Sequence, residues 1–337
     1  MILILSSEDD RSTSDVMDWL FYYEIPFIRI NESTKIIDFY VDTSISKTVF
    51  QITFEINSQT IKINSNDIFG YWYRRGNIIL RRGNIEHSNS YTYYNVNNYI
   101  NRECSTTSFF IHNFLRSIEG IGSYLDNSIN KLVVLEIAKK LGLSVPKTLV
   151  TDNKANLLNF FYKNKRIIQK AQSPAGYYDL SKENYLSFYT REIFLDEIEN
   201  SSPYFESSLF QELLEKKYEL RIFYLNGELF TTAIFSQEDK QTEIDFRKYN
   251  WEKPNRTSVY NLPESINVKT CRLMNYLGLK SGSIDMVVTT KNDYVFLEVN
   301  PVGQFSQVSL PGNFNLEKKI ADELKEIYFK RYISNNQ

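Results

Sequence analysis

The feature that most constrains the fold is a pair of apolar runs near the end of the chain, at residues 283–290 and 294–305. A short polar stretch, residues 291–293, separates them. Two apolar runs joined by such a turn predict a β-hairpin.

Three oxygen-bearing side chains interrupt the apolar residues of this hairpin: Asp285, Glu298 and Asn300. Alternation along a strand puts Glu298 and Asn300 on one face, and Asp285 is expected opposite them on the paired strand. Two carboxylates and an amide oxygen suit Mg²⁺ that also binds substrate phosphates. A solvated hairpin face is the alternative, but the apolar neighbours Phe296 and Leu297 favour a metal site.

Composition limits the class of protein. The chain has 337 residues, 42% hydrophobic and 15% aromatic, enough for two or three domains with buried cores. The net charge is −2 without a long basic run, so nucleic acid is not expected as a partner. Two cysteines, Cys104 and Cys271, predict no disulfide framework and a cytoplasmic location. No signal peptide is recognised, and no apolar run of about 18 residues predicts a membrane span.

The first part of the chain predicts an α/β layer followed by shorter strands. Residues 2–5 and 27–30 are predicted strands around a helix at residues 14–23, with Ser12 or Ser14 as its cap. Further strands are predicted at residues 36–41, 48–56, 60–63 and 69–75.

Two arginines end the last of these strands. Arg74 and Arg75 are candidates for holding a carboxylate or phosphate of a substrate, and a solvated strand terminus is the alternative. Arg247, in a polar loop, is a third candidate for substrate binding. A helix is predicted at residues 95–118, and His112 among its phenylalanines is expected to be a packed residue.

The middle of the chain carries isolated lysines beside predicted elements. A Gly-, Asn- and Ser-rich passage at residues 121–130 marks a boundary. Lys131 opens the amphipathic helix that follows, and Lys170 ends a predicted strand. Asn226-Gly227 between two apolar runs is the strongest short hairpin signal in the sequence.

Several catalytic motifs are absent. The sequence has no P-loop, no dinucleotide-binding glycine pattern and no nucleophile elbow, and it holds only two histidines. The oxygen-rich hairpin remains, with the two lysines and with Arg221, which follows Glu219 on one face of a predicted strand. A metal, lysines and an arginine together suit phosphoryl transfer, although each residue alone also fits a solvated face.

The order of these features resembles the ATP-grasp superfamily, which joins a carboxylate to a nucleophile through an acyl-phosphate. The resemblance covers residues 125–312 and, more loosely, the N-terminal part. Residues 284–285 and 297–301 match the family's metal-binding strands closely. ATP and Mg²⁺ are the implied cofactors. The implied metal ligands are Asp285, Glu298 and Asn300.

The resemblance also implies roles around the nucleotide. Lys131 and Lys170 resemble the lysines that reach the phosphates, and residues 210–214 resemble the hinge that receives adenine. Arg221 resembles the arginine that faces the reacting phosphate, so Arg221 and Lys170 are the implied catalytic residues. The implied nucleotide-binding residues are Lys131, Lys170, Gln211, Glu212, Leu213, Leu214 and Glu219. The expected lid, residues 173–179, holds one glycine, fewer than many family lids.

Within the superfamily the chain resembles the ligases that make graspetides, ribosomal peptides with side-chain ω-ester or ω-amide links. It is most similar to the grasp-with-SPASM subgroup. Residues 72–75, with the sequence Trp-Tyr-Arg-Arg, and residues 303–305, with Gly-Gln-Phe, carry this likeness. The likeness implies a precursor peptide, with leader and core, as the partner, and it implies a homodimer.

The implied fold is of the α+β and α/β classes, an ATP-grasp fold in three parts. These are an N-terminal α/β pre-ATP-grasp domain at residues 1–122, a central subdomain at 123–210 and a C-terminal antiparallel-sheet subdomain at 211–337. The implied activity is ATP-dependent ligation of Asp or Glu side chains to hydroxyls or amines within the peptide. Two alternatives stay open: an amino-acid or glutamate ligase acting on a small molecule or a protein tail, and a nucleotide-binding protein without catalysis.

Overall fold

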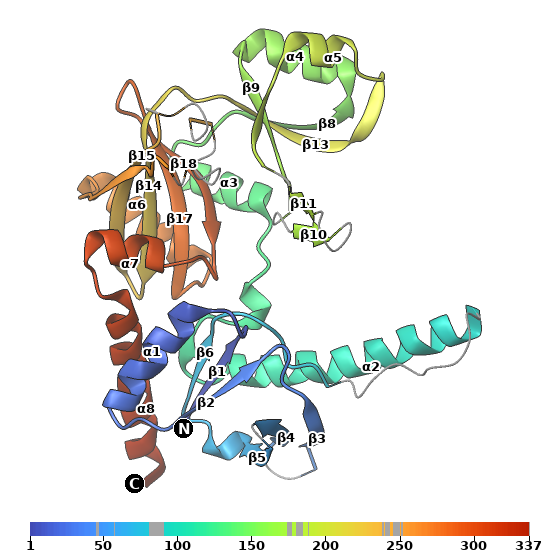
Figure 1. The fold of residues 1–337 in the computed structure, drawn as a ribbon, viewed down its shortest axis with the longest axis vertical. Helices are drawn as coiled ribbons and strands as arrows, with labels where there is room; N and C mark the ends of the chain where they lie inside the picture. The colour runs from blue at the N-terminus through green and yellow to red at the C-terminus, as the bar shows by residue number, and fades with distance from the viewer. Residues whose placement is uncertain are drawn as a thin grey trace.

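The computed structural model describes residues 1–44, 47–56, 58–80, 91–173, 177–179, 185–187, 189–237, 239, 243–244, 250 and 252–336. Arg247 and residues 174–176 of the expected lid therefore lie outside the described residues. Figure 1 shows an N-terminal unit below and two further units above it, with the C-terminal helix running back down beside the first unit. Every helix in the described part of the chain is too short or too polar to span a membrane.

The N-terminal unit is built on a parallel sheet with the strand order β2-β1-β6-β7. Its elements are β1 (Ile2–Ser6), α1 (Arg11–Tyr22), β2 (Phe27–Asn31), β6 (Gly70–Tyr73) and β7 (Gly120–Ile121). The predicted α/β layer is confirmed, but the predicted cap of α1 is wrong. Asp10 caps the helix, because its carboxylate accepts the backbone N–H of Thr13 at 3.1 Å.

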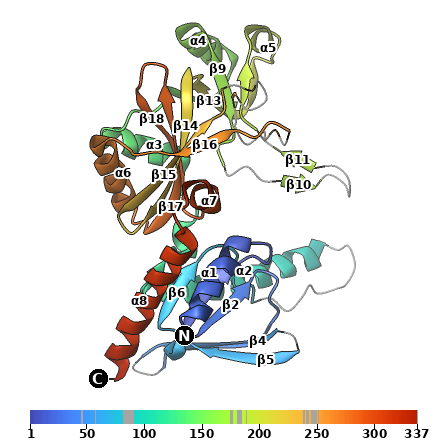
Figure 2. The same ribbon diagram turned by 60° about the vertical axis from the view of Figure 1, so that its left-hand side comes forward.

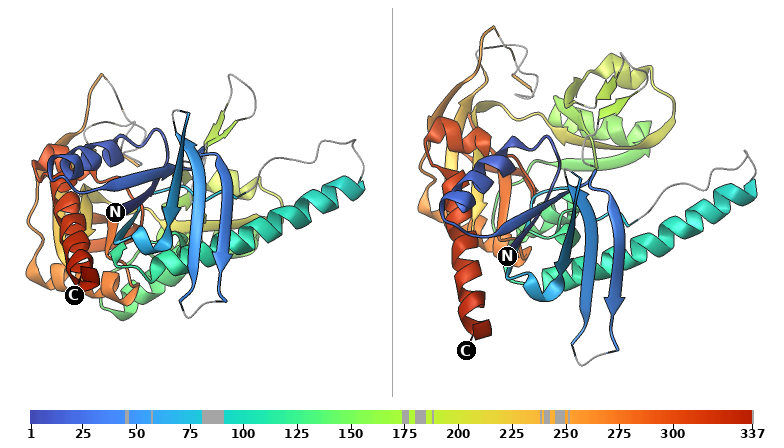
Figure 3. Two further views of the ribbon diagram at one scale, coloured as in Figure 1. Left: turned by 90° about the horizontal axis from the view of Figure 1, so that it is seen from below. Right: turned by 60° about the horizontal axis from the view of Figure 1, so that its bottom comes forward.

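A second sheet in this unit is antiparallel and packs against the long helix α2 (Figure 3). Its strands are β3 (Ile36–Asp42), β4 (Val49–Ile56) and β5 (Gln59–Asn64), and α2 covers Tyr91–Arg116. His112 is buried in α2, stacked on Tyr124 with ring centroids 4.0 Å apart. Burial lowers its pKa to about 4, which fits the predicted packed residue. Two 3₁₀ turns, Ser65–Asp67 and Tyr124–Asp126, complete the unit.

The central unit is a four-stranded antiparallel sheet with the order β12-β9-β13-β8. Its strands are β8 (Thr148–Asn153), β9 (Ile167–Lys170), β12 (Arg191–Ile193) and β13 (Tyr204–Glu212). Two helices, α4 (Lys154–Asn164) and α5 (Leu195–Glu199), pack beside it. A small hairpin, β10 (Tyr177–Asp179) with β11 (Tyr185–Ser187), projects from this unit (Figure 1).

The C-terminal unit is a five-stranded antiparallel sheet with the order β16-β15-β14-β17-β18. The strands are β14 (Lys216–Leu225), β15 (Glu228–Phe235), β16 (Arg256–Val259), β17 (Ser281–Thr289) and β18 (Tyr294–Asn300). Both predicted hairpins are confirmed. Asn226 and Gly227 have φ angles of 45° and 101°, the left-handed values that a tight two-residue turn needs.

Helices cover both faces of this sheet. One face packs on α3 (Lys131–Lys140) and α6 (Glu264–Tyr276). The other packs on α7 (Ser306–Gly312) and the start of α8 (Leu316–Asn336). The same helix α8 continues onto α1 and β6, as Figure 2 shows, so one hydrophobic core joins the first and last units. The domain boundaries stay a proposal: β13 runs to residue 212, and α3 packs on the C-terminal sheet.

This shared core generates a stability prediction. Leu324 on α8 is 0% exposed and belongs to the cluster that includes Ile4 and Trp72. Leu324→Ala is expected to lower the free energy of unfolding by roughly 2–5 kcal/mol, because it leaves a cavity between two units. The matched control is Glu326→Ala on the exposed face of α8. Its free energy of unfolding is expected within about 0.5 kcal/mol of the native value. Denaturant unfolding measures both, and equal effects would contradict the shared core.

Candidate active site

A row of three charged side chains crosses three neighbouring strands of the C-terminal sheet. Arg221 on β14 is in register with Asp285 on β17, and Asp285 is in register with Glu298 on β18. Residues paired in this way lie on the same face of a sheet, so the three side chains project together. We call them the central row. Its register agrees with the placement of Asp285 opposite Glu298 that alternation predicts.

Each carboxylate of the central row is held by a cation. Arg221 Nη1 donates to Asp285 Oδ1 at 2.5 Å, and Lys131 Nζ lies 2.9 Å from Glu298 Oε2. Lys131 stands at the first position of α3, where Asn130 caps the helix, and its amine also donates to Ala171 O at 3.3 Å. Like charges opposite each other on paired strands repel, and these two cations offset that repulsion. Arg221 Nε is buried with no hydrogen-bond partner among the described residues.

Asn300 lies one step along the strand from the central row. It is in register with Ser283, two residues after Glu298, so its side chain starts on the same face. The Asn300 Oδ1 atom accepts the backbone N–H of Val302 at 3.1 Å, and the Asn300 carbonyl accepts that of Gly303 at 3.0 Å. These bonds fold the chain into a tight turn directly after β18. Close approach requires glycine here, because a Cβ at Gly303 would lie 2.3 Å from Ser283 Cβ.

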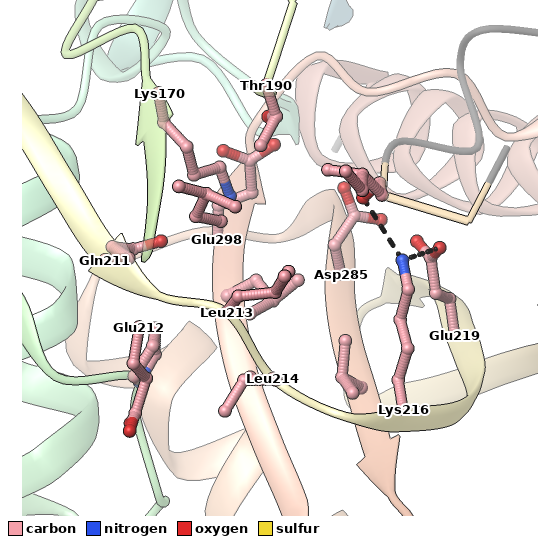
Figure 4. Close-up of a pocket in the computed structure, with 15 residues that line it drawn as sticks. Lys170, Thr190, Gln211, Glu212, Leu213, Leu214, Lys216, Glu219, Asp285 and Glu298 are labelled. Atoms are coloured by element: carbon pink, nitrogen blue, oxygen red, sulfur yellow. Dashed lines mark hydrogen bonds and ion pairs between the residues drawn. The ribbon is translucent and has the colours of Figure 1, made fainter. Parts of the chain in front are cut away.

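A cleft of about 650 Å³ separates the central and C-terminal units beside this row (Figure 4). Its walls include apolar side chains from both units: Pro146, Ile168, Leu213, Leu214, Val287 and Leu297. Lys170 of β9 reaches into it toward Glu298, and Asp285 lies nearby (Figure 4). The cleft therefore has an apolar part that suits a flat ring and a charged part that suits phosphate.

A buried ion pair lies at another side of the cleft. Lys216 Nζ donates to Glu219 Oε1 at 2.5 Å, and both side chains are less than a tenth exposed, at 8% and 9%. Ser236 Oγ donates to the same oxygen at 2.9 Å, and Lys216 also donates to Ile244 O at 3.2 Å. Burial raises the pKa of Glu219, although Lys216 and Ser236 oppose that rise. This pair presents polar groups to any ligand in the cleft.

The expected hinge residues line the cleft, but two of them are engaged elsewhere. Glu212 accepts the backbone N–H of Lys147 at 2.9 Å and lies 3.0 Å from the Lys147 amine. Gln211 is 2% exposed, and its amide donates to Thr148 Oγ1 at 3.0 Å. Leu213 donates its backbone N–H to Arg166 O. The side chain of Glu212 is thus directed at Lys147, while the nearby backbone and Leu214 form the wall of the cleft.

A second, larger cavity of about 1380 Å³ adjoins the cleft. The two spaces share Lys170, Thr190 and Glu298. The second is also lined by Lys131 and Asn300. The charged part of the cleft therefore also borders this second space.

The structure places Arg74 away from any open substrate surface, which corrects its predicted role. The carboxylate that Arg74 and Arg75 hold is the chain's own Asp10, at 3.2 and 2.9 Å. The Arg74 side chain is 4% exposed, so the substrate contact expected from its place at a strand end is wrong. Arg75 is 36% exposed and keeps one accessible side.

Several residues of the site were not predicted from the sequence. Lys216, which begins β14, and also Thr190 and Ile168, belong to no motif in the sequence. The short spacing between Lys216 and Glu219 was the one available signal. Asp10 could have been recognised as a helix cap, but its two arginine partners, Arg74 and Arg75, are more than sixty residues away.

The donor set fits Mg²⁺ that is shared with a substrate. Among the described residues, no group of three His, Cys, Asp or Glu side chains is arranged to hold a metal ion. Asp285 and Glu298 supply two carboxylates, and Asn300 supplies an amide oxygen near them. Mg²⁺ usually binds through one or two carboxylates and completes its shell with substrate phosphates and water. This smaller set is therefore the one expected for a metal that arrives with a nucleotide.

No protein-family model matches the sequence, and a search of curated proteins finds no match. Solved structures match almost the whole chain. Macrocyclase MdnC from Microcystis aeruginosa MRC, bound with precursor peptide MdnA, is 25% identical with a TM-score of 0.76; the match covers 96% of this chain and 99% of that chain. The RiPP-associated ATP-grasp ligase of Chryseobacterium gregarium, in complex with ADP and a leader and core peptide, is 24% identical with a TM-score of 0.79, covering 96% of each chain. ATP-grasp ligase PsnB, with minimal precursor, Mg and ADP, is 16% identical with a TM-score of 0.72, covering 97% of each chain.

The buried pair in the cleft generates a prediction. Lys216→Met is expected to cost roughly 3–5 kcal/mol of unfolding free energy at pH 7, because it leaves the Glu219 carboxylate buried without its cation. The cost falls as the pH is lowered, since protonated Glu219 is neutral and needs no partner.

Denaturant unfolding at pH 7 and pH 5 measures this dependence. The double variant Lys216→Met with Glu219→Gln is the control, and it should recover most of the loss because it holds no buried charge. A pH-independent cost, or no recovery in the double variant, would show that the two side chains do not act as a pair.

Proposed function

We propose that this chain is an ATP-grasp ligase that activates Asp or Glu side chains of a ribosomal precursor peptide as acyl-phosphates. A Ser or Thr hydroxyl or a Lys amine of the same peptide then displaces phosphate, which closes an ω-ester or ω-amide ring. The observation that carries the proposal is the central row beside a cleft between two units. Similarity to a macrocyclase over 96% of this chain and 99% of that chain supports it.

The cleft residues suit ATP in one orientation. The adenine ring fits the apolar part near Leu213 and Leu214, with the backbone there as its polar partner. Glu219, held by Lys216, is placed to accept hydrogen bonds from the ribose. The triphosphate then runs toward Lys170 and the central row, where positive charge is needed.

The chemistry follows from the side chains around the phosphates. Asp285, Glu298 and Asn300 would hold Mg²⁺, which when bound offsets the negative charge of the phosphate oxygens. A peptide carboxylate oxygen attacks the γ-phosphorus, and ADP leaves. Arg221 stabilises the charge that develops on the transferred group, and Lys131 and Lys170 neutralise the oxygens beside it. The peptide hydroxyl or amine attacks the acyl carbon, and phosphate leaves with the former carboxylate oxygen.

The second cavity is the entry route that we propose for the peptide. It shares Lys170 and Glu298 with the nucleotide cleft, so a carboxylate in it is close to the reacting phosphate. A leader segment docked elsewhere on the enzyme would raise the local concentration of the core.

Arg75 stays a candidate substrate residue, and Arg247, outside the described residues, stays one as well. The expected homodimer is a prediction that light scattering tests.

The first prediction concerns the reaction. Incubation with ATP, Mg²⁺ and a precursor peptide, found as a short reading frame near the gene and rich in Thr, Ser, Lys, Asp and Glu at its C-terminal end, is expected to remove the mass of one water for each link. Mass spectrometry measures this. A gain in mass would instead favour a ligase for small molecules or protein tails, and ATP binding without turnover would favour a protein without catalysis.

The second prediction concerns the metal. Glu298→Gln is expected to lower turnover by about 100-fold or more. Mutation of residues that only contact a metal ligand commonly lowers metal affinity or activity by about 10–100-fold, and loss of a ligand should cost at least as much. The fold should be kept, since the exchange preserves shape. Glu228→Gln, an exposed position on the same sheet, is the control. Native turnover in Glu298→Gln would reject the metal assignment.

The third prediction separates chemistry from binding. Arg221→Ala is expected to lower kcat by about 100-fold or more, because a donor to the developing charge is lost. The affinity for ADP should change far less. Single-turnover kinetics and calorimetry measure the two quantities, and an effect on nucleotide affinity alone would contradict the role given to Arg221.

A further inference from the structure

Arg74 joins the N-terminal unit to the turn that follows β18. Its Nη1 donates to Val302 O at 2.5 Å and to Gly303 O at 3.2 Å. Its Nη2 donates to Gln304 Oε1 at 2.8 Å. One guanidinium therefore binds three consecutive residues of this turn, although more than two hundred residues separate them in the sequence.

The other side of the guanidinium is anchored in the N-terminal unit. Arg74 Nε lies 3.2 Å from Asp10 Oδ2, and the Arg74 backbone N–H donates to Leu5 O at 2.9 Å. Asp10 is itself fixed as the cap of α1. The guanidinium also stacks over the Phe305 ring, 5.3 Å from its centroid. Such a charge, buried and paired on several sides, is costly to disturb.

The turn that Arg74 holds is the one that orients Asn300. Val302 N–H donates to Asn300 Oδ1, so the position of Val302 sets the direction of the Asn300 amide. Arg74 binds the carbonyl of the same Val302, and Ser283 Oγ binds Gln304 O at 3.2 Å from the other side. A chain of direct contacts thus runs from Asp10 through Arg74 and Val302 to Asn300.

We propose that Arg74 is a positioning residue for the active site: by fixing the turn at residues 302–304 it aims the Asn300 amide oxygen at the metal. This inference rests on the proposed function, because it assigns Asn300 to the metal. Outer neighbours of metal ligands act by orienting them, and their loss commonly weakens metal affinity by about 10–100-fold. The N-terminal unit, none of whose described residues lines the nucleotide cleft, thereby takes part in the site.

The test measures the Mg²⁺ concentration that gives half-maximal binding of ADP, by calorimetry, in Arg74→Gln. We expect that concentration to rise about tenfold or more. Hydrogen exchange of the backbone at residues 302–305 should rise as well. The matched control is Arg29→Gln, which removes another many-bonded arginine of the N-terminal unit, with partners Asn31, Ser14 and Glu8. It is expected to lower Tm but to leave the Mg²⁺ requirement within about twofold of the native value.

A double-mutant cycle tests whether Arg74 acts on the metal through Asn300. In an Asn300→Ala background, Arg74→Gln should cause no further change in the Mg²⁺ requirement. If Arg74→Gln does not fold, Gln304→Ala removes one bond from the turn side and should shift the requirement in the same direction by less.

Three results would overturn the inference: a normal Mg²⁺ requirement in folded Arg74→Gln, an equal shift in Arg29→Gln, or full additivity with Asn300→Ala. Turnover of the precursor is a separate measurement. A native chain that binds Mg²⁺ and ADP through Asn300 but forms no link contradicts the proposed function and leaves the role of Arg74 in place. A native chain without Mg²⁺-dependent ADP binding contradicts both.

Discussion

Asp285 and Glu298 lie directly opposite each other on neighbouring strands, and two carboxylates in that position repel. The repulsion is offset by Arg221 from the strand on one side and by Lys131 from the start of α3. The sheet and the helix α3 together bring these two cations to the carboxylates. The two carboxylates that cost stability in an isolated hairpin are ligands suited to a metal ion, and the cations beside them suit a triphosphate. The other features of the site are arranged around this constraint.

The two outer units complete the site in different ways. The central unit supplies Lys170 and one wall of the cleft, so the proposed nucleotide site lies between two sheets. The N-terminal unit reaches the site through Arg74 and shares a hydrophobic core with α8. The position of the turn after β18 therefore depends on packing at both ends of the chain. Residues 72–75 and 303–305, which both carry the sequence likeness, contact each other through Arg74.

Local patterns predicted much of the fold and part of the site. Alternation in residues 294–300 put Glu298 and Asn300 on one face, and the Asn226-Gly227 pair identified the neighbouring hairpin, because both depend on short-range geometry. The residues that were missed depend on contacts distant in the sequence. Lys216 is in the site because it contacts Glu219 and the carbonyl of Ile244. Arg74 was expected at a surface because nothing in a single strand shows that another unit covers its end.

The central claim is that the proposed ligation passes through an acyl-phosphate formed from a peptide side chain. The most direct test uses a precursor whose side-chain carboxylates carry ¹⁸O. Attack of a labelled oxygen on the γ-phosphorus, followed by loss of phosphate on ring closure, predicts one ¹⁸O atom in the inorganic phosphate for each link formed. Mass spectrometry of the phosphate measures this transfer. Links formed without label in the phosphate would contradict the account.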